Sequence, residues 1–313
     1  MKAYGPVPSR RLGRSLGINN IPPKICTYSC IYCQLGRTID IRTERSSFYN
    51  PEDLVKEVEE KLEQAEIQEE AIDYLSFVPD GEPTLDRQLG EEIDLLSSTG
   101  VEVAVISNSS LVTEPEVRAD LGKADWVSLK VDAVNEEVWR GLNRPDASFD
   151  LDEILRGIER FSDQFSGVLA TETMLIDGVN DGLSETGNIA NFLEGIDPDE
   201  AYISIPTRPP AEDWATAASE ANITQAYQQF SKNLRNVEYL LGYEGNQFSS
   251  TGDLEEDLLS IASVHPIREE GIEKLLEKTE SSWQLVDKLI EEGKLIETEF
   301  ENSVFYTRRL PKS

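Results

Sequence analysis

Residues that cross-link a fold or bind metals are scarce in this chain. Its 313 residues include three cysteines and a single histidine, His265. An odd number of cysteines does not fit a framework of paired disulfides. A structural zinc site needs four closed ligands, and the histidine lies far downstream of all three cysteines. Zinc held by the cysteines and one outside ligand therefore stays only as an alternative.

Long apolar segments are also missing. No run approaches the roughly 20 apolar residues of a membrane-spanning helix. Residues 1–6 lack the apolar core of a secretory signal. Unpaired cysteines are typical of a reducing compartment. We therefore expect a cytoplasmic protein that does not enter a membrane.

Basic residues are outnumbered by acidic ones. The chain has 29 lysines and arginines against 60 aspartates and glutamates, a formal net charge of −31. This charge argues against general electrostatic binding to nucleic acids, and adaptation to high salt would also account for it. Residues 1–45 differ from the rest, with eight basic and two acidic side chains. Binding of an anionic ligand near this region is one explanation for its positive charge, and a set of surface arginines without a ligand is the other.

The cysteines that are present lie close together. Cys26, Cys30 and Cys33 fall within eight positions at CxxxCxxC spacing. Thiolates are the ligands that iron–sulfur clusters prefer, and an electron-transfer cluster usually takes four of them. With three, one iron of a cubane would keep an open position where a small molecule binds. We interpret the rest of the chain as a scaffold around this stretch.

Short apolar strands alternate with helices through most of the chain. Strands are predicted at 15–18, 74–78, 101–106, 126–131, 168–175, 201–205 and 237–241, and the rest of 4–24 as irregular backbone. Helices are predicted at 51–62, 86–98, 114–121, 135–142, 150–164, 184–195 and 219–234. Repeated strand–helix units form a parallel sheet with helices outside. About six units are too few to close an eight-stranded barrel, so we predict an α/β fold with a partial (β/α)6 TIM-like barrel.

The alternation stops near residue 250. Residues 249–252 have the composition of a linker. Residues 253–313 are predicted as three helices (254–264, 268–277, 281–292) and a hairpin (295–298, 304–307). This order suggests a winged-helix-like domain at 253–313 after a core domain at 1–250. The second helix carries several glutamates, which favours contact with a protein or with the core over DNA.

The cysteine stretch resembles a known family. Cys26, Cys30 and Cys33, with Tyr32 just before the last cysteine, look like the cluster motif of the radical S-adenosylmethionine (SAM) enzymes.

Other segments extend this resemblance over about residues 1–250. Residues 80–83 are similar to the superfamily's glycine–glycine–glutamate motif, although Asp80 departs from it at the first position. The segments 4–11, 26–37, 79–85 and 206–210 look like the archaeal group related to the wybutosine tRNA-modifying enzymes.

The resemblance implies an iron–sulfur oxidoreductase. The three cysteines would hold one 4Fe-4S cluster, and SAM would chelate the remaining iron. One electron then cleaves SAM to methionine and a 5′-deoxyadenosyl radical, which abstracts hydrogen from a substrate. The family's electron comes from a ferredoxin or flavodoxin, and Arg10 and Arg11 would help to recruit such an acidic carrier.

The resemblance also implies where SAM binds. In folds of this kind active-site residues lie at the carboxyl ends of strands. Asp80, Gly81 and Glu82 would offer acceptors to the ammonium of SAM, because glycine lets a backbone approach a ligand closely.

Four further residues are candidates for the rest of SAM. Asn108 and Lys130, at the next two strand ends, would contact the ribose and the carboxylate. Tyr32 and Ile176, the latter within 175–180, would contact the adenine. The alternatives are that Asn108 only shapes a turn and that Lys130 only neutralises Asp132.

These motifs leave alternatives for the reaction. The archaeal wybutosine enzymes carry a second cluster on additional cysteines, which this chain lacks, and they act on tRNA, which its charge disfavours. A tRNA-modifying enzyme is therefore an alternative to an enzyme with another substrate. Arg208, near a late strand end, would face the substrate or form a salt bridge. A second alternative is a non-catalytic iron–sulfur sensor with the winged helix as its output.

Overall fold

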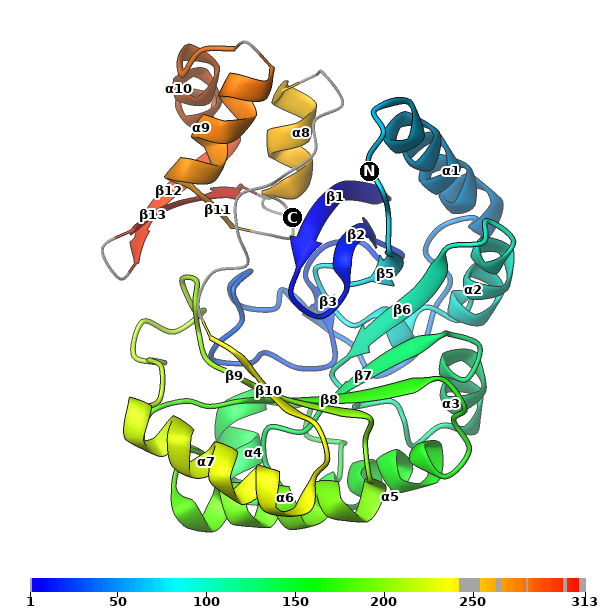
Figure 1. Ribbon diagram of the computed structural model, residues 1–313, viewed down its shortest axis with the longest axis vertical. Coiled ribbons are helices and arrows are strands. Elements are labelled where there is room, and N and C mark those ends of the chain that lie inside the picture. The colour runs from blue at the N-terminus through cyan, green and yellow to red at the C-terminus, as the bar shows by residue number, and fades with distance from the viewer. Residues whose placement is uncertain (1, 242–253, 263–265, 280, 301–302, 310–313) are drawn as a thin grey trace.

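The computed structural model describes residues 2–241, 254–262, 266–279, 281–300 and 303–309. Its main sheet has eight strands and curls into an open half-barrel (Figure 1). In spatial order the strands are β1 (Ala3–Ser9), β2 (Gly13–Ile18), β5 (Tyr74–Phe77), β6 (Glu102–Ser107), β7 (Trp126–Lys130), β8 (Val168–Met174), β9 (Glu200–Ser204) and β10 (Val237–Leu240). β1 and β2 pair antiparallel, and the later neighbours pair parallel.

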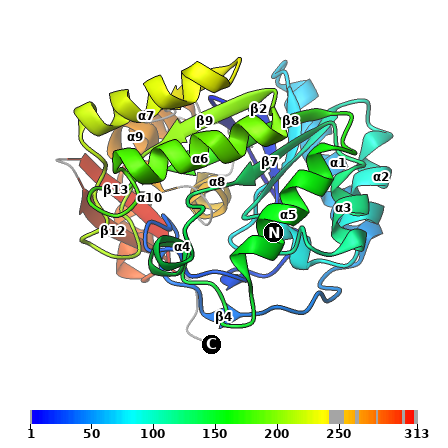
Figure 2. The same cartoon turned by 90° about the horizontal axis from the view of Figure 1, so that it is seen from below.

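Helices cover the outer face of this sheet (Figures 1 and 2). They are α1 (Pro51–Ile67), α2 (Leu89–Ser97), α3 (Pro115–Leu121), α4 (Glu136–Asn143), α5 (Leu151–Ser162), α6 (Leu183–Ile196) and α7 (Glu220–Asn233). A short 3₁₀ turn, η1 (Pro83–Leu85), follows β5, and β3 (Ile25–Cys26) pairs with β4 (Asp40–Ile41) outside the main sheet. The predicted α/β partial barrel is confirmed.

Capping residues determine where two of these helices begin. Asn50 accepts a hydrogen bond from the backbone N–H of Asp53, and Pro51 occupies the first turn of α1. Asp150 accepts from the N–H of Glu153 at 3.0 Å and is the N-cap of α5. Such caps pair backbone groups that a helix end leaves unbonded.

The prediction of irregular backbone before β2 was wrong. Residues 3–9 form β1, which lies at one edge of the sheet. The segment contains Pro6 and Pro8, which weaken any sequence signal for a strand. An edge strand tolerates proline because part of its backbone needs no neighbour, and the register shifts between Tyr4 and Val7.

The core lies between the sheet and its helices. Residues from successive strands are fully buried there, among them Leu16, Phe77, Val105, Leu129 and Ile203. The strand side chains that face the helices form this core, whereas polar side chains such as Ser76, Lys130 and Glu172 line the cavity on the other face. Within the described ranges, no helix has both the length and the apolar character needed to cross a bilayer.

A second group of elements follows after residue 253. It contains α8 (Leu254–Ile261), β11 (Ile267–Arg268), α9 (Glu269–Lys278), α10 (Gln284–Glu291), β12 (Leu295–Phe300) and β13 (Ser303–Arg308). The three strands form an antiparallel sheet in the order β11-β13-β12. Leu258, Ile272 and Leu289 belong to a separate apolar core.

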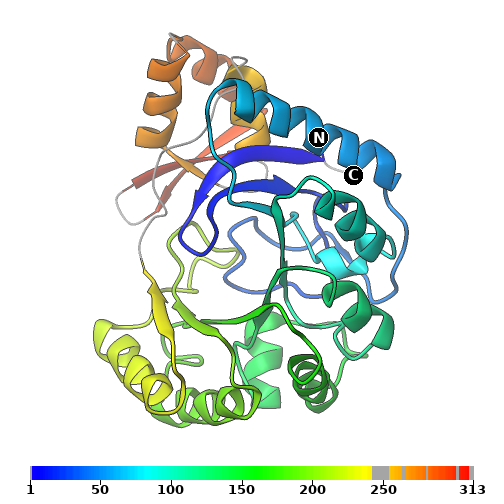
Figure 3. The same ribbon diagram turned by 45° about the vertical axis from the view of Figure 1, so that its right-hand side comes forward.

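This C-terminal segment contacts the half-barrel. Helix α8 packs beside β1, and Val7 of β1 joins the C-terminal core (Figures 1 and 3). The three helices and the final hairpin follow the predicted order, and the structure adds the short strand β11, which the sequence did not predict. We keep the winged-helix assignment as a proposal. The predicted boundary at 250–253 lies outside the described residues, as does His265.

Glu92 in α2 makes stability depend on pH. Its side chain is fully buried, and burial, reinforced by the carboxylate of Asp86, raises the pKa of Glu92 to about 9. An acid whose pKa is raised on folding stabilises the fold at low pH, and that stability is lost as the pH rises toward the folded-state value.

We expect Glu92→Gln to remove this dependence. The variant's free energy of unfolding should gain about 4 kcal/mol on that of the wild type between about pH 5 and about pH 8, because each pH unit in this range contributes about 1.4 kcal/mol. Urea denaturation at several pH values measures the difference. Glu91→Gln, at an exposed neighbouring position, is the control and should show no such trend. A difference that stays constant with pH would contradict the burial argument.

Candidate active site

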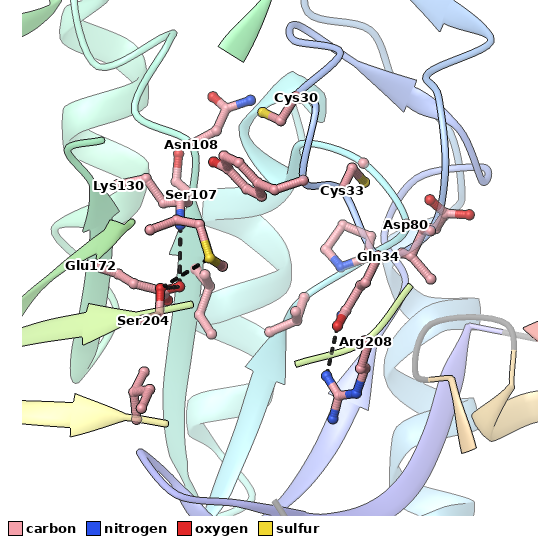
Figure 4. A pocket seen from close by; sticks show the side chains of 18 of the residues that line it. Cys30, Cys33, Gln34, Asp80, Ser107, Asn108, Lys130, Glu172, Ser204 and Arg208 are labelled. Carbon is pink, nitrogen blue, oxygen red and sulfur yellow. Dashed lines mark hydrogen bonds and ion pairs between the residues drawn. The ribbon is translucent and has the colours of Figure 1, made fainter. Parts of the chain in front are cut away.

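All three cysteines open onto one cavity. It has a volume of about 340 Å³ and is lined by Cys26, Cys30 and Cys33. Figure 4 shows Cys30 and Cys33 at this cavity. Each of the eight strands of the main sheet also contributes at least one lining residue. The cavity is therefore the interior of the half-barrel, and its volume is typical of a ligand site.

The cysteine loop is held in place by backbone hydrogen bonds. The N–H groups of Ser29 and Ile31 donate to the carbonyls of Asn143 and Leu142 at the end of α4, at 3.1 and 3.0 Å. Burial raises the pKa of the Cys30 thiol to about 12 and raises the pKa values of Cys26 and Cys33. Such thiols lose their protons when a metal takes the place of the proton.

The donor set at this end of the cavity is three cysteine thiols. Thiolates are the ligands that iron–sulfur clusters prefer. A closed zinc site would need four such ligands around one point. A cluster in which each cysteine binds its own iron needs no such convergence, so the donors present fit a cluster better than a single ion.

Gly81 joins the strand end after β5 to the cysteine loop. A Cβ atom at this position would lie 1.9 Å from the carbonyl oxygen of Ile25. The N–H of Glu82 donates to that same carbonyl at 3.2 Å, and the N–H of Lys24 donates to the carbonyl of Asp80 at 2.7 Å. Glycine is thus needed for close contact with the backbone that leads into Cys26.

Glu82 lines the cavity, but its carboxylate is bonded within the protein. It accepts from the N–H and hydroxyl of Thr84 at 3.1 and 2.6 Å, from the hydroxyl of Ser107 at 2.8 Å and from the N–H of Asn108 at 2.7 Å. The side chain therefore fixes the end of β5 against the end of β6. Its predicted role as a side-chain acceptor for SAM competes with these four bonds.

Asp80 has an acceptor that the protein does not use. Its Oδ1 lies 3.3 Å from the Nζ of Lys24. Both side chains line the cavity, and neither the Lys24 Nζ nor the Asp80 Oδ2 has a hydrogen-bond partner within the described residues. Burial raises the pKa of Asp80 to about 6, although the ammonium of Lys24 opposes the shift. Sequence reasoning missed Lys24, whose one local signal is its place two residues before Cys26.

Comparison with known proteins places the chain in a family. Residues 20–192 match the model of the Radical SAM superfamily. The chain belongs to the radical SAM superfamily. It is also 45% identical over 310 residues to the UPF0026 protein of Methanocaldococcus jannaschii, a match that covers 98% of this chain and 96% of the relative.

Solved structures agree at the level of fold. A radical SAM methyltransferase from Sphaerobacter thermophilus superposes with a TM-score of 0.55 at 15% identity, over 74% of this chain and 67% of the other. A structure of TYW1 with a lysine-pyruvate adduct bound gives a TM-score of 0.54 at 16% identity, over 71% of this chain and 74% of the other. Radical SAM proteins are generally enzymes, and they generally need a reductant.

Lys130 of this radical SAM protein lies in a buried charge network. Its Nζ is 3.2 Å from Glu172 Oε1 and 3.4 Å from Asp132 Oδ1, and it stands 5.1 Å from the centre of the Tyr32 ring. Burial opposes the charge, but the two carboxylates raise the pKa of Lys130. The predicted pairing with Asp132 is present, and Lys130 also lines the cavity.

Glu172 is a cavity residue that the sequence did not reveal. It forms a salt bridge with Arg11 and accepts from the hydroxyl of Ser204 at 2.9 Å. Burial opposes its ionisation, yet Lys130 and Arg11 hold the pKa of Glu172 at about 2. It faces Lys130 directly in the β7–β8 register, so correct strand pairing is the signal that would have found it.

Of the two residues predicted to contact adenine, Tyr32 lines the cavity and Ile176 does not. Tyr32 lines the cavity and donates through its hydroxyl to Asp132. Ile176 is fully buried and packs with Ile31 and Leu142, with Tyr32 against the same cluster. Its side chain is thus placed behind Tyr32 rather than in the cavity wall.

Arg208 follows β9 and lines the cavity of the radical SAM protein. Its Nη1 donates to the Oε1 of Gln34 at 2.6 Å, which ties the strand end to the residue after Cys33 (Figure 4). Arg208 therefore lies where it would meet a ligand in the cavity, and its contact with a substrate stays a prediction.

Proposed function

We propose that this protein is a radical SAM enzyme that holds one 4Fe-4S cluster on Cys26, Cys30 and Cys33 and acts on a substrate in the same cavity. One observation carries the proposal: every cysteine of the chain opens onto a ligand-sized cavity inside the half-barrel. When bound, the cluster and SAM supply the reductive cleavage that yields a 5′-deoxyadenosyl radical for hydrogen abstraction.

The chain's own groups suit the amino-acid end of SAM. That end carries an ammonium and a carboxylate. The cavity offers the carboxylate of Asp80 and the ammonium of Lys24, each with unused hydrogen-bonding capacity. The two groups form an ion pair at 3.3 Å, and a ligand that bonds both would use the hydrogen-bonding capacity that this pair leaves over. Lys130, fixed by Glu172 and Asp132, contributes a further positive charge to the cavity wall.

Cleavage of SAM tests the proposal. Anaerobically reconstituted protein that receives SAM and dithionite should release methionine and 5′-deoxyadenosine. With the substrate present, the amount released should exceed the amount of enzyme. Without substrate, release should continue as a slow uncoupled reaction. A non-catalytic iron–sulfur sensor would carry the cluster and release no 5′-deoxyadenosine. Adding tRNA in one arm and a metabolite extract in another tests the alternative of a tRNA-modifying enzyme, because the substrate should accelerate release.

We infer that the electron comes from a ferredoxin or a flavodoxin, and that Arg10 helps to dock it. Arg10 is exposed at the turn between β1 and β2, whereas the Arg11 side chain is only 16% exposed and bonds Glu172. Of the two predicted docking residues, Arg11 is therefore part of the cavity wall. Its charge is not available to a large partner.

Arg10→Glu should slow reduction of the cluster by a reduced flavodoxin about three- to tenfold at low ionic strength, because a like charge then faces the acidic carrier. The rate with dithionite should not change. Anaerobic stopped-flow absorbance measures both rates. Arg235→Glu, at an exposed position before β10, is the control, and equal slowing by both reductants would exclude a docking role.

A further inference from the structure

Two side-chain amides point at the sulfur atoms of the cysteine loop. The Nδ2 of Asn108, after β6, lies 3.5 Å from the Sγ of Cys26. The Nδ2 of Asn143, at the end of α4, lies 3.5 Å from the Sγ of Cys30. The two amides come from different elements and reach different cysteines, so one local turn does not account for both.

The orientation of the Asn108 amide follows from its other bonds. Its Oδ1 accepts from the N–H of Ser110 at 3.0 Å, and its Nδ2 donates to the hydroxyl oxygen of Thr27 at 2.7 Å. Turning the amide over would place its oxygen against the sulfur and its nitrogen against another N–H. The donor therefore faces Cys26.

The orientation of the Asn143 amide is fixed by a carboxylate. Its Nδ2 donates to the Oδ2 of Asp132 at 2.8 Å and lies 3.1 Å from the hydroxyl of Tyr32. Only the nitrogen of the amide can donate to this carboxylate, so the nitrogen is also the atom near Cys30. Asn143 is almost completely buried, at 3% exposure, where a hydrogen bond to sulfur is not replaced by water.

The structural roles of Asn108 and Asn143 do not need the contacts between their side-chain amides and the cysteine sulfurs. The turn at Asn108 requires only its Oδ1, and the cysteine loop docks on Asn143 through the backbone carbonyl. The N–H groups that face sulfur are additional to both.

We propose that Asn108 and Asn143 are positioning residues that donate hydrogen bonds to the cluster thiolates and thereby raise the cluster's reduction potential. The inference rests on the proposed function, because it takes the cysteines as cluster ligands. Reduction adds one electron from an external donor and takes up no proton in this step. Hydrogen bonds to the sulfurs stabilise the more negative state and are among the factors that set the potential. The amides would thus make the cluster easier for a carrier protein to reduce.

The test is the midpoint potential of the reconstituted full-length protein, measured by potentiometric titration with detection by electron paramagnetic resonance. Asn108→Leu and Asn143→Leu should each make the midpoint potential more negative. At a fixed applied potential, the ratio of reduced to oxidised cluster should fall by up to about tenfold, which corresponds to about 59 mV for a one-electron couple. The shifts should add in the double variant. Asn180→Leu is the control: Asn180 is fully buried, much as Asn143 is, but its amide donates to the carbonyls of Asp132 and Met174 and not to sulfur.

The outcomes separate the inference from the proposed function. Variants with a full iron complement and an unchanged midpoint would overturn the inference alone. A wild-type protein that assembles no four-iron cluster would overturn both. If the variants assemble no cluster, the test uses wild-type protein labelled with ¹⁵N in the asparagine side-chain amides. Pulsed electron paramagnetic resonance of the reduced cluster should then show coupling to an amide nitrogen. The absence of this coupling would overturn the inference.

Discussion

Cys30→Ala is expected to abolish both the brown absorbance of the reconstituted protein and the release of 5′-deoxyadenosine. The chain has three cysteines, and under the proposed function each would hold one corner of the cluster. Two thiolates cannot occupy three corners, and the sequence offers no further cysteine to replace Cys30. Product formation should fall at least about a thousandfold, because the residue takes part directly in the chemistry.

Iron analysis and product chromatography measure this result. Ser29→Ala is the matched control, because Ser29 lies beside Cys30 in the loop and its hydroxyl makes a long hydrogen bond, accepting from the N–H of Thr38 at 3.3 Å. The control should keep four irons and most of the activity. A Cys30→Ala protein that keeps a full four-iron complement would show that the ligand set is wrong.

Asp80→Asn should weaken SAM binding about 10- to 100-fold, since a charge-assisted hydrogen bond contributes roughly 1.5–3 kcal/mol. The substitution keeps the size of the side chain and removes the charge that we assign to the ammonium of SAM. Lys24→Met should have a similar effect through the carboxylate of SAM. Equilibrium dialysis with the reconstituted protein measures the affinity.

A ligand without the amino-acid end separates this role from general damage. 5′-Methylthioadenosine keeps the adenosine and lacks the ammonium and the carboxylate, so its affinity should be the same in wild type and Asp80→Asn. Asp146→Asn, at a partly exposed position where the carboxylate accepts from Ser148, serves as the matched control for SAM. Equal losses for both ligands would mean that Asp80 shapes the cavity and does not recognise the amino-acid end.

The sequence was sufficient for most of the barrel and for the cysteine loop. The segments 126–131 and 168–175 predicted β7 and β8 because apolar and β-branched residues predominate in both. Cys26, Cys30 and Cys33 were recognisable because three thiols at this spacing are typical of ligands to one shared cluster. Asn108 and Lys130 were found because they end strands, which is where a parallel fold collects polar groups.

The missed residues depend on contacts between distant parts of the chain. Lys24 acquires its meaning only when its backbone pairs with Asp80, and Asn143 only when the end of α4 meets the cysteine loop. Glu172 sits inside a strand between two threonines, where no local pattern marks it. Strand β1 was missed because proline is a local signal against a strand, whereas the edge position that tolerates it is a property of the whole sheet.

The packing of α8 beside β1 also bears on solubility. An open half-barrel has a first strand whose outer backbone groups are able to pair with another chain, a common start of aggregation. Here that strand carries Pro6 and Pro8, which have no N–H to offer, and Val7 is covered by the C-terminal core. The last segment of the chain therefore helps to keep separate copies of this protein from joining edge to edge.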